Sequence, residues 1–181
     1  MENGAIGYQR YLNGDDDGIV DVIRDYKDGL ILYINGITGD ISLAEDIMEE
    51  TFFKIVTKKP KYSAKSSFKT WLYAIGRNTA IDYLRKSNRE LSISDTQLED
   101  EQFLEENYLR AEQKITLHRA LSRLVSEYRQ VLYLSFFEGL SNDEAAKVMH
   151  KSKRQIENLL YRAKKSLRSE LEKEGFEYEI I

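Results

Sequence analysis

The sequence predicts an all-α protein made of two small helical domains joined by an acidic linker. Apolar residues recur at helical spacing, and patterns typical of strands are few. Proline, which interrupts helices, occurs once, at Pro60. Charge also changes sign in blocks: residues 54–89 hold ten basic and one acidic side chain, whereas residues 90–112 hold one basic and eight acidic. These blocks divide the chain.

The predicted domains are residues 1–89 and residues 113–181, with the acidic linker at residues 90–112 and a short acidic tail at the end of the second domain. A chain of 181 residues, 41% of them hydrophobic, suits one or two soluble domains. No apolar run approaches the ~20 residues of a membrane span, and no segment has the pattern of a secretory signal. We therefore expect a cytoplasmic protein.

Metal and cofactor sites are not expected. The chain holds no cysteine, which excludes thiolate metal sites, and its two histidines, His118 and His150, lie far apart in the sequence. We find no glycine-rich phosphate loop and no nucleophile motif.

Three helices are predicted in the first domain. The first spans about 19–37. The second is expected to begin at Ser42, which forms a capping box with Glu45, and to end near Val56. The third spans about 67–86 and follows a basic loop, "KKPKYSAKSS". The inward stripe of the second helix is Ala44, Ile47, Met48, Thr51, Phe52 and Ile55, and that of the third is Phe68, Trp71, Leu72, Ile75 and Thr79.

The second domain ends with two helices whose starts lie eleven residues apart. Capping boxes at Ser141–Glu144 and Ser152–Gln155 mark the starts, and a short turn around His150–Lys151 separates the helices. Two short helices joined in this way are typical of the helix-turn-helix. Before them, the spacing predicts one helix through the leucines at 117, 121 and 124, and another that Gly139 ends.

The last helix carries the positive charge of the second domain, because residues 147–173 hold nine basic and three acidic side chains. In a helix-turn-helix, the N-terminal turns of this helix enter the major groove of DNA. Arginine can then pair with guanine, and glutamine or asparagine with adenine, while residues further along suit the phosphate backbone. The alternative is a bundle corner with a solvated basic face. The candidate DNA-binding residues are Lys151, Ser152, Lys153, Arg154, Gln155, Asn158, Arg162 and Lys165.

Three segments in series, "AEDIMEETFFKIV", "SFKTWLYAIGRNTAIDYLRK" and "EGLSNDEAAKVMHKSKRQIENLLYRAKKSLR", resemble bacterial RNA polymerase sigma factors of the extracytoplasmic-function (ECF) subfamily. The resemblance covers about residues 19–89 and 113–172. It implies a sigma region 2 domain, a sigma region 4 domain, and a protein that is not an enzyme. Such a protein binds core RNA polymerase and directs promoter recognition, DNA melting and transcription initiation.

The resemblance also implies a role for each part. The helix-turn-helix would recognise the promoter −35 element, and region 4 would also contact the polymerase flap. A face of the second helix would bind the clamp helices of the largest polymerase subunit, although a plain solvated acidic face is the alternative. The residues of this face are Asp46, Glu49, Glu50 and Phe53.

The basic loop and the helix after it would bind and melt the −10 element, with Lys61, Tyr62, Lys65, Lys69, Arg77, Asn78, Asp82, Arg85 and Lys86 as candidate residues. Lysines can follow a single-stranded backbone, and an aromatic ring such as Tyr62 can stack on a base. Asp82 could accept a hydrogen bond from cytosine or orient Arg85, and these roles stay open. Trp71 lies on the apolar stripe, so we expect it in the core.

Other partners implied by the resemblance are an anti-sigma factor and promoter DNA. The acidic linker would thread the RNA path of the polymerase, with a disordered tether as the alternative. The sequence departs from the family pattern at Val125, where proline is frequent, and at Glu49–Glu50, where Gln-Glu is frequent.

Two other classes of function, a DNA-binding regulator and a small hydrolase, are alternatives to a sigma factor. An autonomous DNA-binding regulator would use the same helix-turn-helix, but residues 1–89 show no ligand-pocket signature. A small hydrolase would need a carboxylate or histidine cluster, for which Asp15–Asp16–Asp17 is the only dense acidic run. We expect that run to precede or cap a helix instead.

Overall fold

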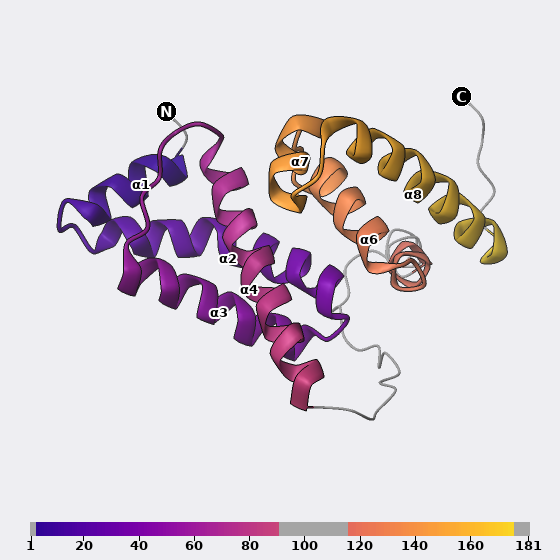
Figure 1. The fold of residues 1–181 in the computed structure, drawn as a ribbon, viewed down its shortest axis with the longest axis horizontal. Coiled ribbons are helices and arrows are strands. Elements are labelled where there is room, and N and C mark those ends of the chain that lie inside the picture. The colour runs from indigo at the N-terminus through magenta and orange to yellow at the C-terminus, as the bar shows by residue number, and fades with distance from the viewer. Residues whose placement is uncertain (1–2, 91–115, 176–181) are drawn as a thin grey trace, which may run out of the picture.

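The computed structural model describes residues 3–90 and 116–175, and every regular element within these ranges is a helix. This confirms the predicted all-α fold (Figure 1). The acidic linker, apart from its first residue, and most of the acidic tail lie outside the described residues. In chain order the elements are α1 (Asn3–Leu12), α2 (Asp17–Thr38), α3 (Ile41–Lys58), α4 (Phe68–Glu90), a helical segment at 116–122, α6 (Ser126–Leu132), the π-helix η1 (Tyr133–Phe137), α7 (Asn142–Met149) and α8 (Lys153–Lys173).

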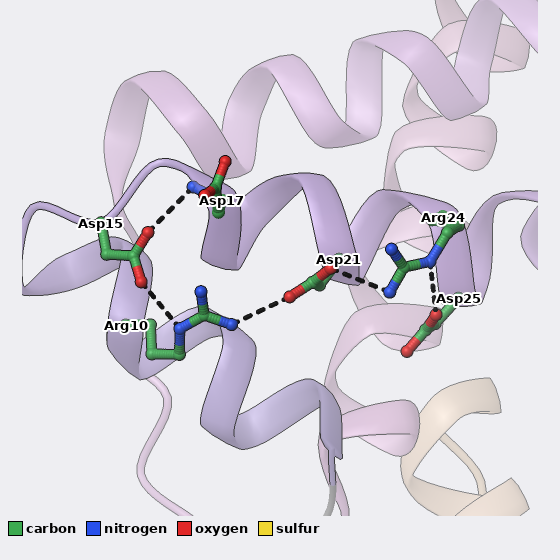
Figure 2. A network of polar contacts seen from close by, with 6 residues as sticks. All are labelled: Arg10, Asp15, Asp17, Asp21, Arg24 and Asp25. Atoms are coloured by element: carbon green, nitrogen blue, oxygen red, sulfur yellow. Dashed lines mark hydrogen bonds and ion pairs between the residues drawn. The ribbon is translucent and has the colours of Figure 1, made fainter.

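Helix α1 is the element that the sequence did not predict. It packs along α2, and the two backbones come close together where Gly7 faces Gly18. A Cβ placed on Gly18 would lie 2.3 Å from the carbonyl oxygen of Gly7, so no larger residue fits there without a backbone shift. Arg10 adds ion pairs to Asp15 at 2.8 Å and Asp21 at 2.9 Å, as Figure 2 shows.

The acidic run Asp15–Asp16–Asp17 leads into α2 and supplies its N-cap and first residue, as expected. Asp16 occupies the N-cap position without a side-chain cap, while Asp15 accepts a hydrogen bond of 3.1 Å from the backbone N–H of Asp17. Within residues 3–90 and 116–175, no group of three or more acidic or histidine side chains could hold a metal ion.

Helix α3 begins earlier than predicted. Asp40, not Ser42, is the N-cap, and its carboxylate accepts a hydrogen bond of 3.0 Å from the N–H of Leu43. Asp40 has the extended backbone of a cap residue, so the helix has already started when the chain reaches Ser42. The predicted inward stripe is correct in the main: Ala44, Ile47, Thr51, Phe52 and Ile55 are buried, and Met48 is half-buried.

The two halves of the chain pack against each other in this structure. One cluster of buried residues includes Leu30 and Leu72 from the first half and Val131 and Ala145 from the second. Helix α7 lies beside α4, and α6 lies beside α2 (Figure 1). The sequence predicts two modules and does not predict this contact between them.

Among the helices within residues 3–90 and 116–175, none combines the length and the apolar composition that a membrane span requires.

Candidate nucleic-acid interface

The helix-turn-helix forms as predicted. Ser141 caps α7 and Ser152 caps α8, each within a complete capping box. At α8, the N–H of Gln155 donates to Ser152 Oγ at 3.2 Å, and the N–H of Ser152 donates to Gln155 Oε1 at 2.7 Å. His150 adopts a left-handed conformation with φ of 53°, which ends α7 and lets α8 start in a new direction.

Helix α8 buries one side and exposes the other. Ile156, Ala163 and Leu171 face the core. The opposite side presents the residues that we call the α8 face, all exposed: Ser152, Lys153, Arg154, Gln155, Asn158, Arg162 and Lys165. Lys151 is half-buried and pairs with Glu127 at 2.9 Å. Apart from Lys151, the predicted residues therefore lie on one exposed surface, on which Lys153 pairs with Asp143 at 2.8 Å.

Three of the six candidate residues on α4, Lys69, Arg77 and Asn78, contact the second half of the chain, and Asn78 is exposed while doing so. Arg77 Nε donates to Gln130 Oε1 at 3.2 Å, and a hydrogen bond of 3.0 Å joins Asn78 Oδ1 to His150 Nε2. Lys69 pairs with the carboxylate of Glu138 at 3.0 Å. We call these contacts, and those of Glu144 below, the domain latch.

Glu144 links the two halves at the start of α4. Its Oε1 accepts hydrogen bonds from Ser67 at 2.8 Å and from Thr70 at 3.3 Å, while its Oε2 completes the capping box of α7 with Ser141. Burial alone would raise the pKa of Glu144, but these hydrogen bonds from Ser141, Ser67 and Thr70 outweigh it and hold the pKa below its ordinary value. The carboxylate thus stays ionised in the latch.

The latch residues on the second half were missed by sequence reasoning. Gln130, Glu138 and His150 had no assigned role, and Glu144 had only its role as a cap. The sequence gives no sign of them, because the burial of the polar residues Thr70 and Gln130, which makes them need partners, is seen only in the structure.

The predicted basic loop, residues 58–67, starts at Lys59 in the structure because Lys58 is the last residue of α3, and it places its candidates differently from α4. Lys61 and Lys65 are exposed. The Tyr62 ring is half-buried, with its centroid 5.5 Å from the rings of Phe68 and Trp71, and its hydroxyl donates to the Ser66 carbonyl at 2.7 Å. In this arrangement the Tyr62 ring packs between the loop and the rings of Phe68 and Trp71, and so supports the loop. Trp71 packs against the core, as expected.

The C-terminal half of α4 carries the remaining candidates. Asp82, Arg85 and Lys86 are all exposed. The latch contacts involve α4 only as far as Asn78. The C-terminal half of α4 therefore stays exposed, while the N-terminal half lies against the second half of the chain.

Helix α3 exposes the predicted acidic face. Asp46, Glu49 and Glu50 are exposed, and Phe53 leaves 63% of its surface open to solvent. Glu50 forms a pair of 3.4 Å with Lys54, one turn along. An aromatic ring this exposed among carboxylates is suited to binding another protein. We call these four residues the α3 face.

Comparison with known proteins decides the family. The model for Sigma-70 region 2 matches residues 22–90, and the model for Sigma-70, region 4 matches residues 114–167. The chain belongs to the ECF group of RNA polymerase sigma factors. Its function is therefore that of a sigma factor in transcription initiation.

Curated relatives match more than four fifths of this sigma factor. RNA polymerase sigma factor SigV of Bacillus subtilis (strain 168) is 30% identical over 156 residues, which cover 86% of this chain and 92% of SigV. ECF RNA polymerase sigma factor SigM of the same organism is 29% identical over 153 residues, covering 83% of this chain and 93% of SigM.

Solved structures share the fold of this sigma factor. CnrH, solved with the cytosolic domain of CnrY, superposes with a TM-score of 0.65 at 20% identity and covers 94% of this chain and 98% of its own. RpoE from Bartonella quintana, solved with the anti-sigma factor NepR, superposes with a TM-score of 0.64 at 22% identity. The match covers 84% of this chain and 97% of the RpoE chain.

Proposed function

We propose that this sigma factor divides its work among three surfaces. The α3 face binds the clamp helices of core RNA polymerase, the α8 face reads the −35 element, and the basic loop with α4 binds and melts the −10 element. The protein acts by binding and not by catalysis, and it works in the cytoplasm with the polymerase. The observation that carries this proposal is that one chain exposes both a basic recognition helix and an acidic face with an aromatic anchor.

The −35 assignment is supported by the geometry of α8. The capping box fixes the first turn, so Arg154 and Asn158 project from a rigid helix end. Arg162 and Lys165 follow one and two turns later and suit phosphate contacts. The small surface hollow between α6 and α8 is lined by Glu127, Lys151, Gln155, Asn158, Leu159 and Arg162.

The −10 assignment requires the two halves to move apart. Lys69, Arg77 and Asn78 are engaged by the latch, so the arrangement described here offers the α8 face but not the whole α4 surface. When only a fraction of the protein is in the binding-competent conformation, its apparent affinity for the target is reduced to that fraction of the full value. Binding to core polymerase and promoter would supply the free energy that opens the latch.

Two further partners belong to the proposal. CnrH and RpoE were solved with CnrY and NepR, and we propose that a comparable anti-sigma factor binds this chain. Region 4 would also contact the polymerase flap. The linker at residues 90–112, nearly all of it outside the described residues, would follow the RNA path of the enzyme.

The proposal as a whole is tested by transcription in vitro. Purified protein is mixed with core polymerase and a genomic DNA pool, and the transcript starts are sequenced. We expect a small set of start sites that share −35 and −10 sequences. Random initiation, equal to that of core enzyme alone, would contradict the proposal.

Replacing Phe53 with alanine should weaken binding to core polymerase by about 30-fold, because truncation of a central aromatic anchor removes ~2 kcal/mol or more. The thermal midpoint should stay the same, since most of the ring is exposed. Val20→Ala is the control, because Val20 is 57% exposed on α2 and outside the α3 face. Fluorescence anisotropy of labelled protein measures the affinity. Equal affinities for the two variants would remove Phe53 from the interface.

A further inference from the structure

Helix α1 precedes the region that the sigma family model matches, yet two of its side chains hold the chain segment leading into the basic loop. The Tyr8 hydroxyl donates to the carbonyl oxygen of Pro60 at 2.7 Å. One turn later, the Tyr11 hydroxyl donates to the carbonyl oxygen of Val56 at 3.0 Å. Val56 lies in the last turn of α3, whereas Pro60 lies in the loop itself. The two hydroxyls therefore hold different elements. The Tyr11 ring also contacts the loop, because the Lys59 ammonium lies 4.6 Å from its centroid.

The Tyr8 side chain is held in place by the residues around it. Only 1% of its surface is exposed, and its ring centroid lies 5.1 Å from that of Trp71 and 5.9 Å from that of Phe68. Burial, with a smaller contribution from Tyr11, raises the pKa of Tyr8 to about 12. The hydroxyl thus keeps its proton near neutral pH and remains a donor.

The helix that carries Tyr8 is itself immobilised on α2. Gly7 and Gly18 allow the two backbones to touch, and Arg10 bridges to Asp15 in the turn and to Asp21 on α2 (Figure 2). These contacts give α1 one position along α2. A hydrogen bond from α1 to the loop can therefore define where the loop starts.

The basic loop has a conformation that needs such support. Lys59 and Ala64 both adopt positive φ, at 43° and 54°, which is unfavourable for residues with a side chain. Pro60 lies between them, and the Tyr62–Ser66 hydrogen bond closes the loop on its far side. Tyr8 fixes the near side.

We propose that Tyr8 is a positioning residue for promoter melting. Its hydroxyl anchors Pro60 and so sets the shape in which the basic loop meets the unpaired −10 strand. Tyr8 touches no DNA in this scheme and acts through the loop backbone. The inference rests on the proposed function, in which this loop contacts the −10 element.

The test uses the protein bound to core polymerase and single-stranded oligonucleotides. One oligonucleotide carries a −10 sequence found by transcript-start sequencing, and the others each carry one substituted base. Tyr8→Phe keeps the buried ring and removes only the hydroxyl. We expect the affinity ratio between the preferred and substituted bases to fall about fivefold at one or more positions, the equivalent of one hydrogen bond of ~1 kcal/mol. Core binding should be unchanged.

Tyr11→Phe is the matched control, because it removes a similar hydrogen bond from the same helix to α3 and keeps the ring that contacts Lys59 of the loop. It should lower the thermal midpoint about as much as Tyr8→Phe while leaving base discrimination intact. The proposal is overturned if Tyr8→Phe leaves discrimination unchanged, or if both variants reduce it equally.

Lys61→Ala and Lys65→Ala separate this inference from the function on which it rests. If the loop binds the −10 strand, both changes weaken all oligonucleotides alike, since exposed lysines contact the backbone. Should neither change alter binding, the −10 assignment of the loop is wrong, and the role of Tyr8 fails with it.

Discussion

Replacing both Arg154 and Asn158 with alanine should reduce transcription from promoters with the preferred −35 element by at least about 30-fold. Both side chains are exposed on the first turns of α8, and each bidentate base contact contributes ~1–3 kcal/mol of discrimination. Neither residue belongs to the capping box, so the helix itself should be unaffected. Transcription from a promoter series with single −35 substitutions measures the effect.

The pattern of the loss matters as much as its size. The double variant should lose its preference at the bases that the two side chains read, so promoters with substitutions there should now resemble the parent promoter. Lys165→Ala is the control, because a phosphate contact weakens all sequences equally and lowers the salt dependence by about one counterion. If the double variant behaves like Lys165→Ala, then Arg154 and Asn158 contact the backbone.

Replacing Asn78 with alanine should decrease melted promoter complexes about tenfold or more while binding to core polymerase stays the same. Exposing a base costs a few kcal/mol of stacking, which a protein offsets with a pocket and hydrogen bonds. Losing one such hydrogen bond of ~1.4 kcal/mol corresponds to a factor of ten. Permanganate footprinting of unpaired thymines measures melting directly.

Asn78 also belongs to the domain latch, so its two roles must be separated. His150→Gly removes the same hydrogen bond from the other side and suits the left-handed backbone at this position. This control weakens the latch but keeps Asn78 available to DNA, and melting should be equal or improved. Equal losses of melting in the two variants would mean that Asn78 acts through the latch alone.

Local signals explain what the sequence could predict. The capping boxes at Ser141 and Ser152 depend on residues three apart, and both formed as expected. The same reasoning placed the start of α3 at Ser42 and was wrong, because Asp40 lies two residues upstream in an extended conformation and caps the helix first. A pattern of side chains does not show which of two nearby caps the backbone uses.

Contacts between distant residues explain what could not be predicted. Helix α1 contains Gly4 and Gly7, which are poor helix formers, and it is stabilised by close packing on Gly18. The latch joins residues far apart in the chain, such as Arg77 with Gln130. The exposure of the α8 and α3 faces followed from helical periodicity, whereas the covering of α4 depends on tertiary structure.

We expect this sigma factor to be closed when free and to open when it binds core polymerase and promoter. The chain has no cysteine, so Asp28→Cys on α2 and Ser169→Cys on α8, both exposed, allow a donor and an acceptor dye to be attached at defined places. Energy transfer between them should decrease when the labelled protein forms a transcribing complex. Glu138→Gln, which removes the charge paired with Lys69, should lower the transfer in the free protein. Unchanged transfer in a complex that initiates transcription would show that α4 reads the −10 element without separation of the domains, which would contradict the proposed opening.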